Sequence, residues 1–225
     1  MAYRCVATSV AGFVQQLAVS YVTNGYYFYV TGRIPDHKDP AQTDRKIIAQ
    51  CGVDISKWTR SRRKKLGQAN VQYLRCGHFY VIMATHGEHP FFTDEAKRVR
   101  DIRRYPLYFQ GYSIGCRRGR RGKAMHASVR IQREYFQKLK QEFERVAVQR
   151  SLEELWHGLR GIPYEPYAPV RDQLRGLLRA VNRRRQVAGL ELLSPNAVWR
   201  RRVPVRPFGA SDEPTKDDSE ESDPA

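Results

Sequence analysis

The sequence predicts an α+β fold, with an antiparallel sheet of about four to five strands, packed helices, a helical C-terminal section and a disordered acidic tail. Strand-like segments cluster between residues 26 and 131, and helical periodicity dominates after them. Apolar residues make up 41% of the 225-residue chain, which is enough for a substantial core. We therefore expect a core domain over residues 1–161, a helical section over 162–210 packed on it, and the tail over 211–225.

The first elements are a helix and a strand. Residues 9–24 carry apolar side chains at helical spacing before Asn24-Gly25, which favours a helix that ends there. The same dipeptide is also a hairpin signal, so a strand is the alternative. Residues 26–34 are rich in Tyr, Phe and Val and predict a strand.

Three helices and two strands are expected next. The helices run from Asp39-Pro40 to Gly52, from a cap at Asp54 over residues 55–66, and from a cap at Thr93 to about Arg104. Between the last two, residues 71–75 and 78–84 predict a pair of strands. The second of these strands is almost entirely apolar, so we expect it at the centre of the sheet.

The remaining elements are two strands and then helices. Residues 108–116 and 125–131 predict the strands, and a helix continues to about Arg150. The capping-box pattern Ser151-Leu-Glu-Glu154 predicts a new helix that ends at Gly161. Another helix is expected over residues 170–188, followed by a short one at Ser194-Pro195.

The charge of the chain indicates a polyanionic partner. The net charge is +17, although the last fifteen residues hold seven acids and one lysine. Such an excess of positive charge destabilises a compact domain through self-repulsion, and a nucleic acid would relieve it. Arginines outnumber lysines by 30 to 10, and the planar arginine fork suits phosphate oxygens. A basic surface that only maintains solubility is the alternative.

Three basic segments are the candidate nucleic-acid contacts. The first is the arginine- and glycine-rich loop at 117–123, whose glycines allow close approach to a phosphate backbone. The second is a stripe at i, i+4 spacing on the helix at 170–188, which could instead dock on Glu153 and Glu154. The third is the helix at 55–66. The candidate residues of the loop are Arg117, Arg118, Arg120, Arg121 and Lys123. Those of the stripe are Arg171, Arg175, Arg179 and Arg183, and those of the helix at 55–66 are Lys57, Arg60, Arg62, Arg63, Lys64 and Lys65.

Trp58 lies among the basic residues of the third segment. An aromatic side chain beside basic residues can stack on an unpaired base, although a tryptophan is more often a core anchor. None of the motifs that read a base sequence is present, so DNA and RNA remain open as partners.

A histidine cluster leaves a catalytic alternative open. His78 begins the expected central strand, and His86, Glu88 and His89 follow its end. These side chains could bind a divalent metal that polarises a phosphate, with Tyr80, Tyr112 or Tyr135 as the nucleophile. Under this alternative the protein is a metal-dependent single-strand nuclease or strand-transfer enzyme of a mobile element or replicon. A zinc site of Cys76, His78, His86 and His89 is a further option without standard spacing.

The stretch His78-Phe79-Tyr80 resembles the histidine-hydrophobic-histidine tyrosine endonucleases of replication, plasmid transfer and transposition. That family places two histidines at alternate positions on a central strand. The resemblance covers about a dozen residues, and here Tyr80 stands where the family has its second histidine. It implies a metal-dependent nicking activity, for which one ligand is missing.

The remaining expectations concern location and regulation. Four widely spaced cysteines fit reduced thiols, and neither a signal peptide nor an apolar stretch of membrane-spanning length is recognisable. We therefore expect a cytoplasmic protein that does not act in a membrane. The acidic tail could compete with nucleic acid for the basic surface. An interaction module for an acidic protein or a ribonucleoprotein is the third functional alternative.

Overall fold

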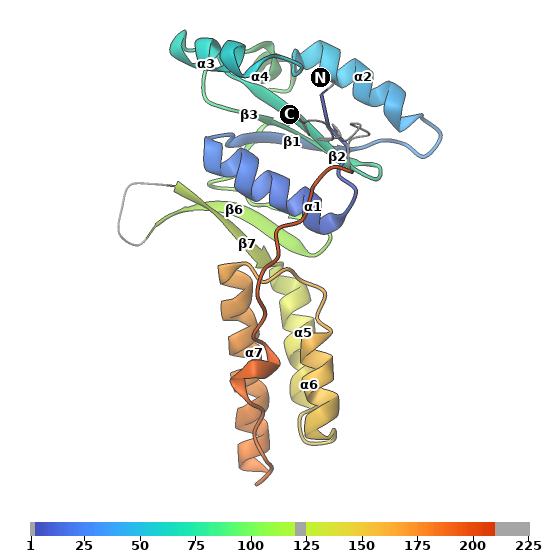
Figure 1. Ribbon diagram of the computed structural model, residues 1–225, viewed down its shortest axis with the longest axis vertical. Helices are drawn as coiled ribbons and strands as arrows, with labels where there is room; N and C mark the ends of the chain where they lie inside the picture. The colour runs from blue at the N-terminus through green and yellow to red at the C-terminus, as the bar shows by residue number, and fades with distance from the viewer. Residues whose placement is uncertain (1–2, 120–124, 210–225) are drawn as a thin grey trace, which may run out of the picture.

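The computed structural model describes residues 3–119 and 125–209 (Figure 1). It confirms the α+β class, with two antiparallel sheets above a lobe of three helices. The predicted Arg120, Arg121 and Lys123 of the basic loop, and the acidic tail, lie outside the described residues.

The larger sheet has the strand order β2-β3-β1-β4, and all its pairings are antiparallel. Its strands are β1 (Phe28–Arg33), β2 (Val71–Cys76), β3 (Phe79–Ala84) and β4 (Arg100–Asp101). The apolar strand β3 lies between β2 and β1, so its predicted central position is confirmed.

The N-terminal helix packs into the core between this sheet and the smaller one. It begins as α1 (Val10–Gln15), continues through a π-helical segment, η1 (Gln16–Tyr21), and ends in η2 (Val22–Asn24). Gly25 stops it with a φ of 91°, which only glycine adopts without strain. The predicted helix over 9–24 is therefore confirmed. Its buried residues share one core with β3 and with the smaller sheet.

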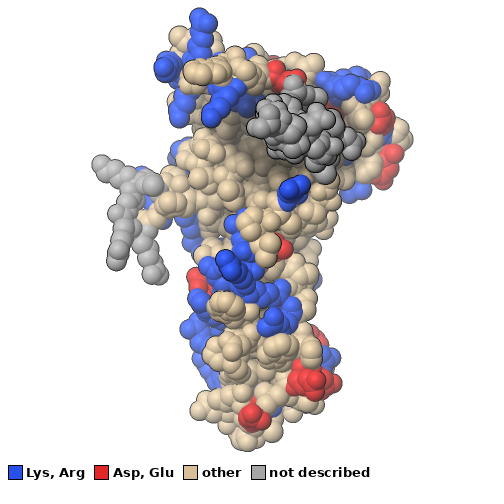
Figure 2. Space-filling model, in the orientation of Figure 1, with Lys and Arg blue, Asp and Glu red and all other residues tan. Residues whose placement is uncertain are grey.

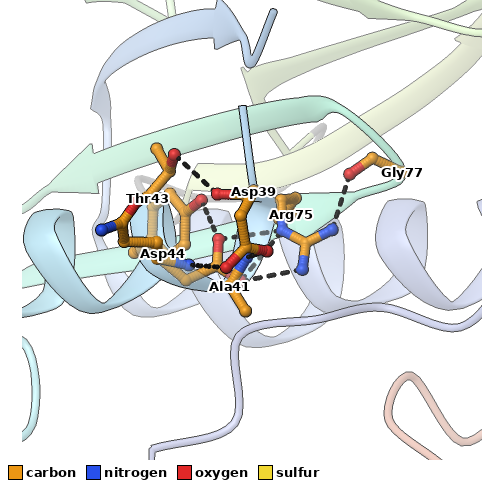
Figure 3. A network of polar contacts seen from close by, with 8 residues as sticks. Asp39, Ala41, Thr43, Asp44, Arg75 and Gly77 are labelled. Atoms are coloured by element: carbon orange, nitrogen blue, oxygen red, sulfur yellow. Dashed lines mark hydrogen bonds and ion pairs between the residues drawn. The ribbon is translucent and has the colours of Figure 1, made fainter. Parts of the chain in front are cut away.

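The helices α2 (Pro40–Cys51) and α3 (Lys57–Lys65) follow β1. Asp39 caps α2 and Gly52 ends it in the left-handed conformation, as predicted. A buried carboxylate attaches α2 to the sheet: Asp44 binds the guanidinium group of Arg75 at 2.8 Å and the hydroxyl of Tyr73 at 2.6 Å (Figure 3).

The helix predicted from Thr93 to Arg104 is wrong. The chain forms only α4 (Pro90–Asp94), which His89 caps by accepting a hydrogen bond from the amide of Phe91 at 3.0 Å. After α4 the chain turns, and β4 pairs with β1 while Ile102 enters the core. Burial of Ile102 and pairing along β1 outweigh the weak helical periodicity.

The single strand predicted over 108–116 is also wrong. The structure has β5 (Leu107–Phe109) and β6 (Tyr112–Arg118), joined by a tight turn in which Gln110 and Gly111 have φ of 44° and 77°. Two positive φ angles are typical of the turn that matches the strand twist. With β7 (Met125–Ile131) these strands form the smaller sheet, in the order β5-β6-β7.

The helical lobe consists of α5 (Arg133–Val146), α6 (Leu152–Arg160), α7 (Ala168–Val187) and the short η3 (Pro195–Ala197). The predicted capping box of Ser151 and Glu154 is present. All these helices contribute to one hydrophobic cluster, which includes Leu159 and Ile162 on both sides of the expected boundary at residue 161.

The segment after η3 returns from the helical lobe to α1 (Figure 1). Arg202 lies over the ring of Tyr167 at 4.5 Å and donates to the side chain of Gln15 at 2.9 Å. The amide of Thr8 donates to the carbonyl of Pro207 at 3.0 Å, and Phe208 packs on the core shared by the two sheets. The C-terminal segment thus ties the helical lobe to the sheets.

Candidate nucleic-acid interface

The helix α3 is short, basic and almost without apolar contacts. Ser56 caps it, because its hydroxyl oxygen accepts from the amide of Thr59 at 3.1 Å; the cap predicted at Asp54 is wrong by two residues. No residue of α3 is buried. Four of its basic residues lie in the last turn, where positive charge interacts favourably with the helix dipole. That interaction helps the helix to form but leaves its charges exposed.

The charges of α3 have no acidic partners within the described part of the chain. None of its six lysines and arginines lies within 4.0 Å of a carboxylate there, although other arginines form such pairs. Figure 2 shows the resulting basic surface at the upper end of the molecule. An unpaired group of like charges on nine residues is unfavourable unless an anion binds it.

The side chains of α3 divide between two faces. Lys57, Arg60 and Lys64 recur at helical spacing and line a cleft. Trp58, Arg62 and Lys65 do not line it, and Trp58 is 87% exposed. The interpretation of Trp58 as a core anchor is therefore wrong. Arg63 is half-buried near His89 and is less accessible than its neighbours.

The cleft has a volume of about 1250 Å³ and lies between α3, the end of the N-terminal helix and the start of β1. The backbone segments that border it come from distant parts of the chain. Arg4, Tyr21 and Tyr27 line it from the N-terminal part, and Arg103 and Phe208 from later parts. Asp54 is the sole acidic residue among the described residues of its lining.

Two aromatic side chains and a guanidinium group line this cleft together. Tyr27 and Phe28 are half-buried, and Arg103 lies over their rings at 4.8 and 5.7 Å. Asp101 holds Arg103 there through hydrogen bonds of 2.9 and 2.7 Å. Because Asp101 neutralises Arg103, this arginine adds little free positive charge to the cleft. Its main contribution there is the guanidinium plane beside the aromatic rings.

Polar groups with unused hydrogen-bonding capacity border the same cleft. Asn70 is 5% exposed, and its amide nitrogen donates to the carbonyl of Arg60 at 3.0 Å. Its side-chain oxygen and the Nε of Arg60 have no hydrogen-bond partner within the described residues. An unsatisfied buried polar group costs about 1–3 kcal/mol of folding free energy.

The structure separates the predicted metal ligands. His78 precedes β3, where its Nδ1 lies 3.1 Å from the carbonyl oxygen of Ile34, whereas His86 and His89 follow the other end of the strand. A six-residue strand spans about 20 Å, so histidines at its two ends are too far apart to bind the same metal ion. No group of three or more potential metal ligands occurs in the described residues. The expected cluster of His78, His86 and His89, with or without Cys76, is therefore not formed.

The residues at the far end of β3 have different positions. His86 lines the cleft, with its ring centroid 6.3 Å from that of Phe28. Glu88 is exposed, and its backbone binds the amide of Ala69 at 3.0 Å. Burial, and then the positive charge of Arg63, lower the pKa of His89, which keeps its ring neutral as a helix cap.

The candidate tyrosine nucleophiles are not gathered at a catalytic site. Tyr112 is buried, and its hydroxyl accepts from the amide of Glu165 at 2.8 Å. Burial raises the pKa of Tyr112 to about 12, which disfavours the attacking phenolate. Tyr80 is half-buried beside Tyr73, and Tyr135 is exposed on α5. The burial of Tyr112 therefore argues against its predicted role as the nucleophile.

The arginine stripe on α7 is largely exposed. Arg171 donates to the carbonyl of Pro166 at 2.9 Å and Arg175 pairs with Asp172, while Arg179 and Arg183 are exposed. The alternative that the stripe docks on Glu153 and Glu154 is wrong. Glu153 lies 3.8 Å from the ring of His157 on its own helix, and Glu154 completes the capping box of α6.

The described part of the basic loop comprises residues 117–119 and begins with the end of β6. Arg117 and Arg118 are exposed there, opposite His126 and Met125 of β7. Their position at the end of a hairpin leaves them accessible to a partner.

Sequence reasoning missed the cleft residues Arg4, Asn70 and Arg103. Arg4 and Arg103 gave no signal, because each is a single basic residue that reaches the cleft only through the fold. Asn70 gave no signal, since only its position in the fold reveals the unsatisfied oxygen.

No protein-family model matches the chain, and neither a curated protein nor a solved structure shows significant similarity to it. Across residues 3–119 and 125–209, no helix combines the length and apolar character needed to cross a bilayer. The charge, exposure and shape of α3 and its cleft therefore carry the functional proposal.

Proposed function

We propose that this protein binds nucleic acid by contacting its phosphate backbone, with α3 as the principal contact. The observation that carries the proposal is the set of six basic side chains on α3 that have no carboxylate within 4.0 Å in the described residues. Phosphate groups would supply the missing negative charge, and arginine and lysine side chains bind them well.

Further basic groups extend this surface. Arg117 and Arg118 at the end of β6, and the exposed Arg179 and Arg183 of α7, are additional phosphate contacts. They lie on elements well separated from α3 (Figure 1). A polymeric anion can reach several of these sites at once, whereas a small anion would occupy one.

The test is the affinity for labelled oligonucleotides across a salt series. Each phosphate contact contributes about 0.7–0.9 to the slope of log affinity against log salt. Replacing the four exposed basic residues of α3 by glutamine should reduce that slope by about two to three. The variant carries Lys57→Gln, Arg62→Gln, Lys64→Gln and Lys65→Gln.

A matched control uses the same charge loss elsewhere. Replacing Lys138, Lys140, Arg145 and Arg150 of the α5 region by glutamine should leave the slope nearly unchanged. Absence of binding at low salt would overturn the proposal. Capture of acidic proteins that survives nuclease treatment would replace it with a protein-interaction role.

A further inference from the structure

We propose that the cleft beside α3 binds an unpaired stretch of a single-stranded nucleic acid, so that bases enter the cleft while phosphates follow α3. This inference rests on the proposed function and adds the class of nucleic acid to it. Three features of the cleft support it: its size, its charge and its aromatic surface.

The size of the cleft suits a polymer segment. Its volume of about 1250 Å³ exceeds the roughly 300–1,000 Å³ that is typical of small-molecule pockets. It is bordered along one side by successive turns of α3. A chain of nucleotides can occupy such a space, whereas a single metabolite would leave much of it empty.

The charge of the cleft suits phosphates. Arg4, Lys57, Arg60 and Lys64 line it, while Asp54 is the one acidic residue in the described lining. The basic side chains of α3 that face the cleft recur along the helix, so they can contact successive phosphates of one strand.

The aromatic surface distinguishes a single strand from a duplex. The guanidinium plane of Arg103, which lies over the ring of Tyr27 and is partly exposed, offers a flat face on which a base can stack. In a duplex the faces of the bases are already stacked on one another, so only an unpaired base can use such a surface.

The first experiment uses the full chain and three oligonucleotides of equal length. These are a single strand, a hairpin duplex and a single strand with abasic sites, each made as DNA and as RNA. We expect the single strand to bind at least about tenfold more tightly than the duplex. Abasic sites should weaken binding about fivefold or more, because stacking contributes that much per base. Equal affinities for all three would overturn the inference.

The second experiment compares matched pairs of variants on the same oligonucleotides. Lys57→Gln with Lys64→Gln should weaken single-strand binding more than duplex binding. Arg62→Gln with Lys65→Gln, on the other face of α3, should weaken both equally. Tyr27→Leu should reduce the preference for the single strand, while Tyr105→Leu, an exposed tyrosine outside the cleft, should leave it unchanged.

The outcomes separate the two proposals. Salt-dependent binding without preference for unpaired strands, and without an effect of abasic sites, would leave the proposed function intact and contradict the role of the cleft. No binding at low salt would contradict both. The abasic comparison uses the unaltered protein, so it remains decisive if a cleft variant fails to fold.

Discussion

At the scale of single residues, Asp44 joins α2 to the sheet through a buried ion pair. Its carboxylate is 5% exposed and accepts four hydrogen bonds, three from Arg75 and one from Tyr73 (Figure 3). A buried ion pair stabilises little relative to apolar residues, but breaking it leaves an uncompensated charge. The pair was not apparent in the sequence, because its members are 31 positions apart.

Asp44→Ala should lower the free energy of unfolding by about 3–5 kcal/mol, since it leaves the guanidinium group of Arg75 unpaired. Urea denaturation monitored by circular dichroism measures the change. The double variant Asp44→Leu with Arg75→Met removes both charges and should recover most of the loss. A loss below about 1 kcal/mol for Asp44→Ala would contradict this assignment.

His89 should make stability depend on pH. Burial and the charge of Arg63 lower its pKa in the folded state, whereas the pKa of a histidine in the unfolded state is about 6.5. The unfolded state therefore binds more protons, and the contribution of His89 is fully present above about pH 6.5 and is lost as the pH falls below it.

His89→Asn keeps a side-chain oxygen that can cap α4 but does not titrate. We expect its stability to fall less than that of the unaltered protein between pH 7.5 and 5.5, as measured by urea denaturation. The difference between the two proteins cancels the contributions of other groups. Equal losses would show that His89 is not the titrating group.

At the scale of elements, local signals predicted most helices and strands. Asp39, Gly52 and the Ser151–Glu154 box define helix ends through contacts within a few residues, and the structure has all of them. The predictions of secondary structure were wrong where contacts between distant parts of the chain determine it, or where the turn residues are unusual. The chain after α4 pairs with β1 instead of forming a helix, and Gln110-Gly111 makes a tight turn without the usual Asn or Asp.

The helix α7 shows why basic residues of one element have different roles. Arg185 is 4% exposed and donates to the carbonyl oxygens of Glu191, Ala147 and Arg150 at 2.6, 2.8 and 3.1 Å. Arg183, two positions earlier, is exposed. The sequence pattern singled out Arg183 as part of a stripe and gave no indication of the structural role of Arg185.

Arg185→Met should therefore destabilise the protein by about 2–3 kcal/mol, because three carbonyl groups lose a buried charged donor. Arg183→Met should change stability by less than about 0.5 kcal/mol. Thermal and urea denaturation measure both. Equal effects of the two substitutions would be inconsistent with the burial of Arg185.

At the scale of the whole molecule, folding assembles the proposed interface from segments that are far apart in the sequence. Arg4, Tyr27, Lys64, Arg103 and Phe208 all line one cleft. Sequence reasoning found the basic helix, because its charges are consecutive, but it could not find the cleft, which exists only after the chain has folded. The prediction of a metal cluster was wrong for the opposite reason. His78 is close in the sequence to His86 and His89, but it lies at the other end of β3.

The acidic tail should compete with nucleic acid for this interface. The chain leaves the described region after Gly209, next to Phe208 at the cleft, and the seven acids follow within residues 211–225. Deleting residues 211–225 should tighten binding to oligonucleotides several-fold at low salt and less at high salt, because salt screens the competition. A tail with its acids replaced by Asn and Gln should behave like the deletion. Unchanged affinity at low salt would rule out this role.

The most direct measurement of the central claim is photochemical cross-linking of the full chain to a single-stranded oligonucleotide, with the attachment sites mapped by mass spectrometry. We expect adducts on peptides that contain Tyr27 and Phe28 and on those that contain α3, and we expect a duplex competitor to remove few of them. Cross-links confined to the helical lobe, or none at low salt, would contradict the assignment of α3 and its cleft as the nucleic-acid interface.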